Sequence, residues 1–233
     1  MDLIHPEQFL DGAVLLIDKS PDWTSFDVVN KIRKLLRQAL GIQKIKVGHA
    51  GTLDPLATGL VIICTGKATK QITQYQELEK VYIAHIKLGA TTPSFDLETE
   101  VDATFPWEHI TRELVEETLH KFIGEQDQLP PLFSAKSVDG KRAYAMARKG
   151  KEVALKPQKI HIYELKVMEF RPPDLTIEVT CSKGTYIRSL ARDLGIEMGS
   201  GAHLTGLRRT RIGRYKVEES ITIEKFRENL ELL

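Results

Sequence analysis

The most constraining pattern in the sequence is a two-residue alternation near its end. Every second residue is apolar at Leu175, Ile177, Val179 and Cys181, and the residues between them are polar. Because successive side chains of a strand point to opposite faces, this alternation predicts a strand with one buried and one exposed face. Such a strand must pair within a sheet, and a chain of 233 residues can bury one large core against it.

The other expected elements do not follow a regular strand-helix-strand rhythm. We expect strands over 13–18, 47–53, 60–64 and 80–88, and one strand face formed by Tyr163, Leu165 and Val167. We expect helices over 25–40 (capped by Thr24 or Ser25), 68–78, 111–122 and 185–198. This mixture favours an α/β fold of the α+β type, in which helices flank a central mixed, mainly antiparallel sheet.

Composition excludes several classes of protein. The two cysteines, Cys64 and Cys181, lie 117 positions apart, which argues against a disulfide framework or a cysteine-based zinc site and suits a reducing cytosol. No apolar stretch approaches the length of a membrane helix, and the first residues do not resemble a signal peptide. The common dinucleotide, triphosphate, zinc-protease and hydrolase motifs are absent, and the histidines are scattered. We therefore expect a cytoplasmic protein without cofactor, metal or membrane.

The charge is distributed in blocks. The totals of 33 basic and 32 acidic residues nearly cancel. Three segments are nevertheless basic: residues 31–70 contain eight basic residues and one acidic residue, residues 130–160 contain eight basic and two acidic residues, and residues 205–217 contain five basic residues and no acidic residue. Residues 91–129 are acidic, with ten acidic and two basic residues. These blocks predict a strongly positive face suited to nucleic acid, although each block taken alone also fits a solvated helix or loop.

The segment from Gly48 to Leu60, GHAGTLDPLATGL, contains the residues best suited to chemistry. Asp54 is its one acid in a basic region, and Pro55 fixes the backbone directly after it. A rigidly placed carboxylate in a positive field stays ionised and can act as a nucleophile. An ordinary Asp-Pro turn or a helix cap is the alternative interpretation.

The same segment closely resembles the catalytic motif of the TruB family of tRNA pseudouridine synthases. Further segments resemble motifs of that family and occur in its order: Asp18-Lys19 with Thr24-Ser25, Lys80-Val81-Tyr82 with Leu88-Gly89, 181–195, and 201–209. Together the matches span roughly residues 15 to 215. The resemblance implies a pseudouridine-synthase fold that acts on the TΨC arm of tRNA and isomerises uridine 55 without metal or cofactor.

The resemblance also implies the main catalytic groups. Asp54 would be the nucleophile, and whether it attacks the ribose or the base is left open. Arg188 would pair with Asp54 and keep it charged; alternatively it is a helix-surface arginine beside Asp193. Tyr82 would stack on the target base, which is compatible with a core position on its strand.

Four more residues complete the expected site. Tyr186 and Leu207 would line the base pocket. His49 would fill the gap left by the flipped nucleotide, because a base must leave its stack before its glycosidic bond can be reached. Lys19 would support the Tyr82 side of the pocket or contact a phosphate.

The resemblance further implies one catalytic domain over 1–233, acting as a monomer. The basic segment 130–160 falls where the family has an insertion that closes on the tRNA, and we expect it to act as an RNA clamp. Only about 16 residues follow Val217, so no C-terminal PUA domain is expected. Lys19-Ser20-Pro21-Asp22 replaces the Lys-Pro-x-Gly of the family, and Thr92-Pro93-Ser94 replaces Thr-Asp-Thr.

Two other functions remain open at this stage. The chain could be a tRNA-binding or tRNA-folding module that has kept the scaffold; the intact set of Asp54, Tyr82 and Arg188 argues against this. It could also be a guide-RNA-dependent relative that resembles dyskerin. The stand-alone form of the motif, Pro55 to Gly59, and the expected lack of a PUA domain argue against that second function.

Overall fold

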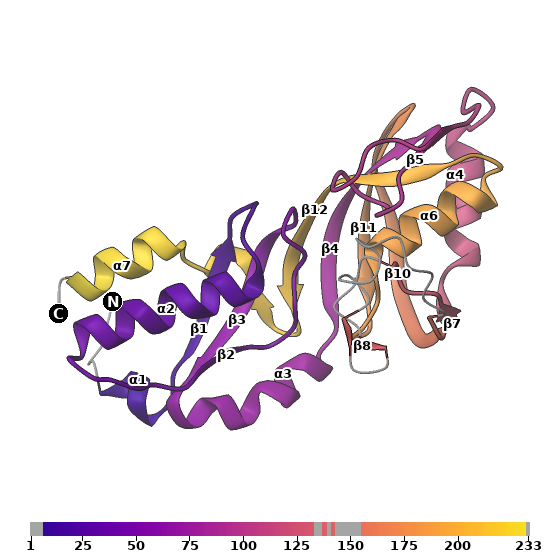
Figure 1. The fold of residues 1–233 in the computed structure, drawn as a ribbon. Helices are drawn as coiled ribbons and strands as arrows, with labels where there is room; N and C mark the ends of the chain where they lie inside the picture. The colour runs from indigo at the N-terminus through magenta and orange to yellow at the C-terminus, as the bar shows by residue number, and fades with distance from the viewer. Residues whose placement is uncertain (1–6, 133–136, 139–140, 143–154, 232–233) are drawn as a thin grey trace. The chain divides into compact units, whose positions relative to one another are not determined.

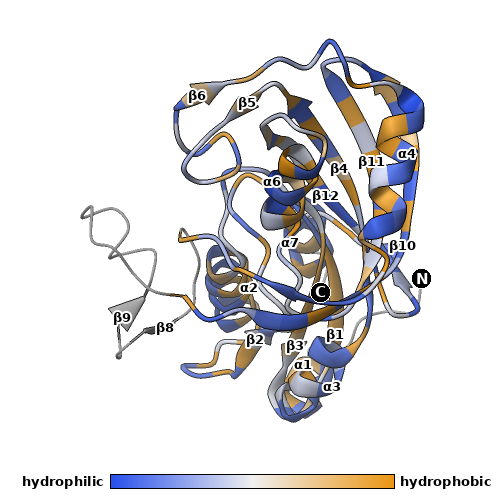
Figure 2. Cartoon of the chain, turned by 90° about the vertical axis from the view of Figure 1, so that its right-hand side faces the viewer, coloured by the Kyte–Doolittle hydropathy of each residue, from blue (hydrophilic) through white to orange (hydrophobic). Residues whose placement is uncertain are grey.

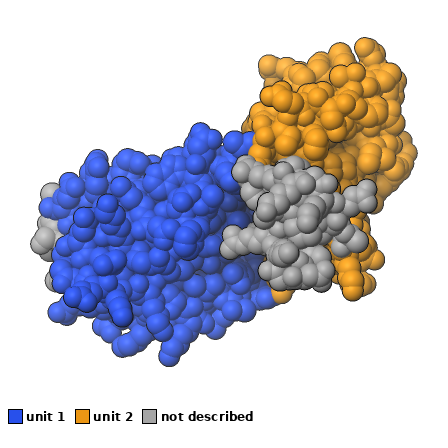
Figure 3. Space-filling model, viewed as in Figure 1, with its two compact units in different colours: residues 1–82, 208–233 blue, residues 83–207 orange. Residues whose placement is uncertain are grey.

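The computed structural model describes residues 7–132, 137–138, 141–142 and 155–231. The chain divides into two compact units, coloured separately in Figure 3. Unit 1 consists of residues 1–82 and 208–233, and unit 2 of residues 83–207. Strands β4 (Lys80–Leu88) and β12 (Ala202–Ile212) each begin in one unit and end in the other.

Unit 1 is a small sheet with helices on both faces. Its strands are β1 (Val14–Lys19), β2 (Val47–His49), β3 (Thr58–Thr65) and β13 (Tyr215–Lys216), together with parts of β4 and β12. Its helices are α1 (Gln8–Asp11), α2 (Ser25–Ala39), α3 (Ile72–Glu77) and α7 (Ile223–Glu231), with short 3₁₀ helices at Gly66–Gln71 and Val217–Glu219. Strand β3 lies between β1, which is antiparallel to it, and β12, which is parallel to it.

Helix α2 shows how local sequence sets the fold of this unit. The Thr24 side chain accepts a hydrogen bond from the Asp27 amide (3.0 Å), and the Asp27 carboxylate accepts one from the Thr24 amide (2.9 Å). This reciprocal capping box starts the helix where the sequence predicts it. Helices α2 and α7 run side by side (Figure 1), and the apolar side of α2 is buried at Val28, Val29, Ile32 and Leu36. Figure 2 shows hydrophobic stretches on the strands of this unit.

Unit 2 consists of a second, mainly antiparallel part of the sheet and two longer helices. Beside β4 come β11 (Asp174–Cys181), β10 (Gln158–Arg171) and β7 (Gly124–Gln128), in that order. The helices are α4 (Arg112–Lys121) and α6 (Ile187–Glu197), and the short strands are β5 (Ala90–Thr91), β6 (Ala103–Thr104), β8 (Ser137–Val138) and β9 (Lys141–Arg142). The predicted mixed α/β fold is confirmed, as are the alternating strand β11 and the strand over 80–88.

Strand β10 departs from the predicted pattern. The expectation that Tyr163, Leu165 and Val167 share one face is wrong for Tyr163, which is 49% exposed. The register against β11 shifts between Ile162 and Glu164 and again between Val167 and Glu169. A β-bulge inserts one unpaired residue and reverses the alternation beyond it. Strand β10 therefore buries Ile162 before the first bulge and Leu165 after it.

Candidate active site

Asp54 lies in unit 1, in the loop between β2 and β3. Its carbonyl oxygen accepts a hydrogen bond from the Ala57 amide (3.1 Å), which closes a turn with Pro55 at the second position. Proline favours that position because its ring fixes φ near the value the turn needs. The Asp54 residue is half-buried, whereas Leu53 before it is buried and Pro55 after it is exposed. The loop therefore holds a partly accessible carboxylate beside the core of unit 1.

Ser25, the first residue of α2, anchors the chain just before Asp54. The Ser25 hydroxyl accepts a hydrogen bond from the Leu53 amide (2.8 Å) and donates one to the Leu53 carbonyl oxygen (3.3 Å). Both groups are buried. The helix N-terminus and the loop are thus tied together at the residue that precedes the carboxylate.

Lys19, the last residue of β1, anchors the chain just after Asp54. Only 1% of the residue is exposed, and its ammonium group donates to the carbonyl oxygens of Ser20 (3.0 Å), Trp23 (2.7 Å) and Pro55 (3.0 Å). An ammonium group has three donors, and all three are used by these carbonyl oxygens. Lys19 therefore supports the Asp54 loop, and its support of the Tyr82 side of the pocket or contact with a phosphate stays a prediction.

The surroundings of Lys19 also change its ionisation. Burial lowers the pKa of Lys19 from 10.5 to about 8, with the Asp54 carboxylate opposing that change and the Arg209 guanidinium adding to it. In the adjoining loop, Asp22 has a φ of +64°, a conformation that aspartate tolerates better than most residues. The Asp22 amide donates to the Pro55 carbonyl oxygen (3.0 Å), so this loop and the Asp54 loop are joined.

Arg209 of β12 holds the Asp54 loop from another side. It is the largest of the fully buried side chains, and its guanidinium donates to the carbonyl oxygens of Leu60 (2.8 Å), Thr52 (3.3 Å) and Gly51 (3.2 Å). Strand β12 approaches β3 closely because Gly59, opposite Arg209, has no side chain. A Cβ atom at Gly59 would lie 2.3 Å from the Arg209 carbonyl oxygen.

His49 and Tyr82, two more predicted site residues, also belong to unit 1. His49 ends β2, opposite Ile63, and its buried Nδ1 atom has no hydrogen-bond partner among the described residues. Burial lowers the pKa of His49; a backbone contact with Gly51 opposes this effect, and Arg209 adds to it. A neutral ring is the form suited to stacking on bases. Tyr82 is a buried residue of β4, consistent with the predicted core position.

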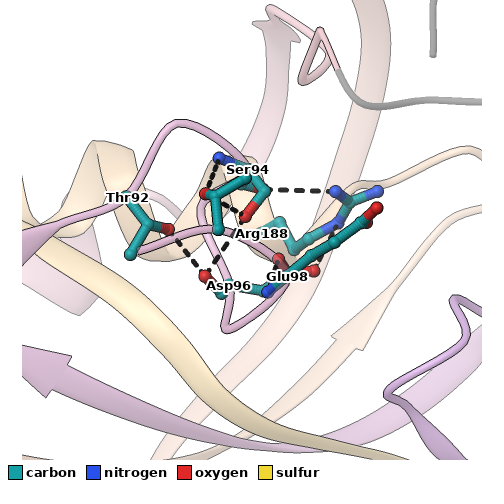
Figure 4. A network of polar contacts seen from close by, with 6 residues as sticks. Thr92, Ser94, Asp96, Glu98 and Arg188 are labelled. Carbon is teal, nitrogen blue, oxygen red and sulfur yellow. Dashed lines mark hydrogen bonds and ion pairs between the residues drawn. The ribbon is translucent and has the colours of Figure 1, made fainter. Parts of the chain in front are cut away.

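Arg188 lies in the first turn of α6 in unit 2 and is buried there. Its guanidinium donates to the Ser94 carbonyl oxygen (3.2 Å), and its Nε atom lies 3.7 Å from a carboxylate oxygen of Asp96. Figure 4 shows these groups converging on the loop that follows β5. The alternative of a surface arginine is wrong, because only 3% of Arg188 is exposed; Asp193 pairs with Arg192 (2.6 Å). The pair between Arg188 and Asp54 stays a prediction.

Tyr186 and Leu207 complete the predicted set, also in unit 2. The Tyr186 amide donates to the side chain of Gln128 (2.8 Å), and that side chain donates to the Tyr186 carbonyl oxygen (3.0 Å). Gln128 is buried at the end of β7. Its side-chain amide exchanges two hydrogen bonds with the Tyr186 backbone, as a residue of a paired strand would. Leu207 is partly buried on β12, consistent with a residue that lines a pocket.

The basic block over 205–217 is not the free positive stripe that the sequence suggests. The Arg208 guanidinium binds the two carboxylate oxygens of Asp18 at 3.0 and 2.8 Å, and Arg211 pairs with Glu79 at 2.8 Å. With Arg209 buried, the exposed cations of this block are Arg214 and Lys216. The block over 31–70 retains more exposed charge, at Lys34, Arg37, Lys44, Lys46, Lys67 and Lys70.

The segment 130–160, the predicted RNA clamp, lies largely outside the described residues. Within the parts of the chain that are described, no group of three or more potential metal-ligating side chains is present. In those parts there is also no helix long and apolar enough to cross a membrane.

A family model, TruB family pseudouridylate synthase (N terminal domain), matches residues 37–187. The chain belongs to the TruB family. A second model, tRNA pseudouridylate synthase B C-terminal domain, matches residues 188–232. The predicted family is therefore confirmed by two consecutive matches that together extend almost to the last residue.

Individual TruB relatives match over nearly their whole length. The chain is 60% identical over 223 residues to tRNA pseudouridine synthase B of Phocaeicola vulgatus, covering 96% of this chain and 95% of that protein. It is 53% identical over 227 residues to the protein of the same name from Flavobacterium johnsoniae, covering 97% and 99%.

Solved structures show the same fold. The crystal structure of a Cbf5-Nop10-Gar1 complex matches with a TM-score of 0.71 and 28% identity, covering 95% of this chain and 55% of that chain. The structure of an H/ACA RNP bound to a substrate RNA containing 2'-deoxyuridine matches with a TM-score of 0.69 and 26% identity, covering 95% and 54%. The chain thus spans about half the length of these structural neighbours.

Sequence reasoning missed the residues that hold the predicted site residues in place. Ser25, Gln128 and Arg209 act through backbone groups of distant segments, and such partners leave no periodic signal. For Arg209 one signal was available. Its strand partner Gly59 belongs to the motif, and a glycine at that place indicates a close approach of another backbone.

Proposed function

We propose that this chain is a tRNA pseudouridine synthase that converts uridine 55 of the TΨC loop to pseudouridine. The observation that carries the proposal is the position of Asp54, a half-buried carboxylate in a proline turn anchored by Lys19, Ser25 and Arg209. Such preorganisation places a reactive group without further ordering during the reaction. The near-complete match to relatives named tRNA pseudouridine synthase B supplies the substrate class.

The reaction is an isomerisation. The C1′–N1 bond of the nucleoside breaks, the base turns, and a C5–C1′ bond forms. The C5 proton is lost and N1 gains one, so product and substrate have the same composition. Asp54 acts as the nucleophile, and Arg188 pairs with it and keeps it ionised.

The base pocket is assigned to the remaining predicted residues. Tyr82 stacks on the target base, and Tyr186 and Leu207 line the pocket. His49 occupies the space that the flipped nucleotide leaves, which offsets part of the few kcal/mol that unstacking costs. Its pKa, lowered by burial, keeps the ring neutral and suited to stacking. We further propose that the protein acts in the cytoplasm as a monomer, with the segment 130–160 as its RNA clamp.

The test is turnover on an unmodified tRNA transcript that carries tritium at C5 of its uridines. The wild type should release tritium and form pseudouridine at position 55 alone. Asp54→Asn should release none while it still binds the tRNA. Asp11→Asn is the matched control, because Asp11 is an exposed residue of the same unit that pairs with Lys67. Failure of the wild type to form product under conditions in which it binds tRNA would overturn the proposal.

The same assay separates the two alternatives. A tRNA-binding or folding module would bind the transcript without releasing tritium. A guide-dependent enzyme would release tritium only when a guide RNA is added. The relatives at 53–60% identity carry the name of the stand-alone enzyme over nearly their whole length.

A further inference from the structure

Arg209 is unusual because it is a fully buried arginine with neutral partners. Its three hydrogen bonds go to backbone carbonyl oxygens, and no carboxylate among the described residues forms an ion pair with it. Burying a charge costs free energy unless hydrogen bonds and an opposite charge compensate. The carbonyl oxygens meet the hydrogen-bonding need of the guanidinium.

The carbonyl partners of Arg209 define where it acts. Those of Gly51 and Thr52 lie three and two residues before Asp54, and that of Leu60 lies in β3 after the loop. The planar Arg209 guanidinium therefore connects the backbone that precedes Asp54 to strand β3, which follows the loop. Gly51, with a φ of +105°, gives the backbone the turn it makes at this place.

Lys19 supports the same loop on the side after Asp54. Its ammonium group donates to the Pro55 carbonyl oxygen (3.0 Å), whereas the Arg209 guanidinium donates to the carbonyl oxygens of Gly51 and Thr52 before Asp54. The two buried cations therefore hold the backbone on both sides of the carboxylate.

We propose that Arg209 is a positioning residue for the nucleophile: its guanidinium ties the backbone before Asp54 to the strand after the loop and so places the carboxylate. This inference rests on the proposed function of the chain. All the hydrogen bonds of Arg209 lie within unit 1. Arg209 does not touch the substrate in this scheme and acts through the Asp54 loop.

The experiment compares three variants in single-turnover tritium release over a series of protein concentrations, which separates the rate constant from tRNA affinity. Arg209→Met removes charge and donors, Arg209→Lys keeps the charge with a different donor geometry, and Arg227→Met is the control. Arg227 is a surface residue of α7 in the same unit, 3.6 Å from Glu231. Circular dichroism and tRNA binding are measured for each variant.

We expect Arg209→Met to lower the rate constant on the order of 100-fold, the cost of a small misplacement of a reacting group. Its tRNA affinity should stay within about threefold, because Arg209 does not touch the substrate. Arg209→Lys should recover part of the rate, because its ammonium group can donate to some of the same carbonyl oxygens. Arg227→Met should match the wild type.

Three results would overturn the inference. They are a normal rate for Arg209→Met, a loss of tRNA affinity in that variant as large as its loss of rate, and a rate for Arg209→Lys no higher than that of Arg209→Met. If Arg209→Met does not fold, Arg209→Gln replaces it, because it keeps amide donors without the charge. An inactive wild type would instead refute the proposed function, so the two failures are distinguishable.

Discussion

Lys19 permits a quantitative test of the buried environment around the Asp54 loop. Its pKa is about 8 in the folded protein, compared with 10.5 for an ordinary lysine. The unfolded chain therefore binds the Lys19 proton more tightly than the folded chain does. The contribution of this residue to stability is lowest below pH 8 and rises with pH between 8 and 10.5. Lys19→Met removes the titration and retains most of the side-chain length.

The size of the effect follows from those two pKa values. Integrating the proton linkage from pH 7 to pH 9.5 gives a gain of about 2 kcal/mol for the wild type relative to Lys19→Met. Other titrating groups are common to both proteins and cancel in this difference. The difference in unfolding free energy, wild type minus variant, should therefore increase by about 2 kcal/mol over that range.

The assay is urea unfolding at pH 7 and pH 9.5, followed by the fluorescence of Trp23 in a Trp107→Phe background. Trp23 belongs to unit 1 and Trp107 to unit 2, so the signal reports the unit that contains Lys19. Lys67→Met is the control, because Lys67 is an exposed lysine of the same unit. It should show no comparable dependence on pH. A wild-type minus Lys19→Met difference that is constant within about 0.5 kcal/mol would refute the reasoning, because the Lys19 pKa would then be ordinary.

Two further predictions concern groups that position the site. Thr24→Ala removes the capping box of α2 and should lower the unfolding free energy by about 1 kcal/mol, as measured by urea unfolding. Thr111→Ala removes the N-cap of α4 and should lower the stability of unit 2 by a similar amount. An unchanged unfolding free energy in either variant would contradict the capping argument. Gln128→Ala removes both hydrogen bonds to the Tyr186 backbone. Because each bond contributes roughly 0.5–1.5 kcal/mol, the variant should lower kcat/KM on the order of tenfold in the tritium assay. An unchanged kcat/KM would show that the position of Tyr186 does not depend on Gln128.

The elements that the sequence predicted well are those whose signal is local. Helix α2 has its cap, its apolar spacing and its end within one short segment, and β11 alternates without interruption. Strand β10 also has apolar residues at regular spacing, but its partner β11 imposes two bulges on it. Which residue of a strand is left unpaired depends on the neighbouring strand. The local sequence of β10 does not contain that information.

The residues of the candidate site also differ in whether their signal is local. Asp54 could be found from sequence because the motif around it is contiguous. The roles of Lys19 and Arg209 depend on carbonyl oxygens brought close by folding, and a carbonyl oxygen is present in every residue. The charge count of 205–217 overstates its free positive charge, because Arg208 and Arg211 pair with acids that lie far away in the sequence. The proposed pairing of Arg188 with Asp54 stays a prediction from the motifs.

The discontinuity of unit 1 has a consequence for the synthesis of the chain. Residues 1–82 leave the ribosome first, while the strand that carries Arg209 and the helix α7 that packs against α2 come among the last residues made. The Asp54 loop is therefore complete in sequence long before its guanidinium anchor exists. A chain interrupted before residue 208 contains the motif and lacks the anchor. Nascent or truncated chains would thus carry the nucleophile in a loop that has the Lys19 and Ser25 anchors without the Arg209 anchor, and the last 26 residues determine when the loop reaches its final form.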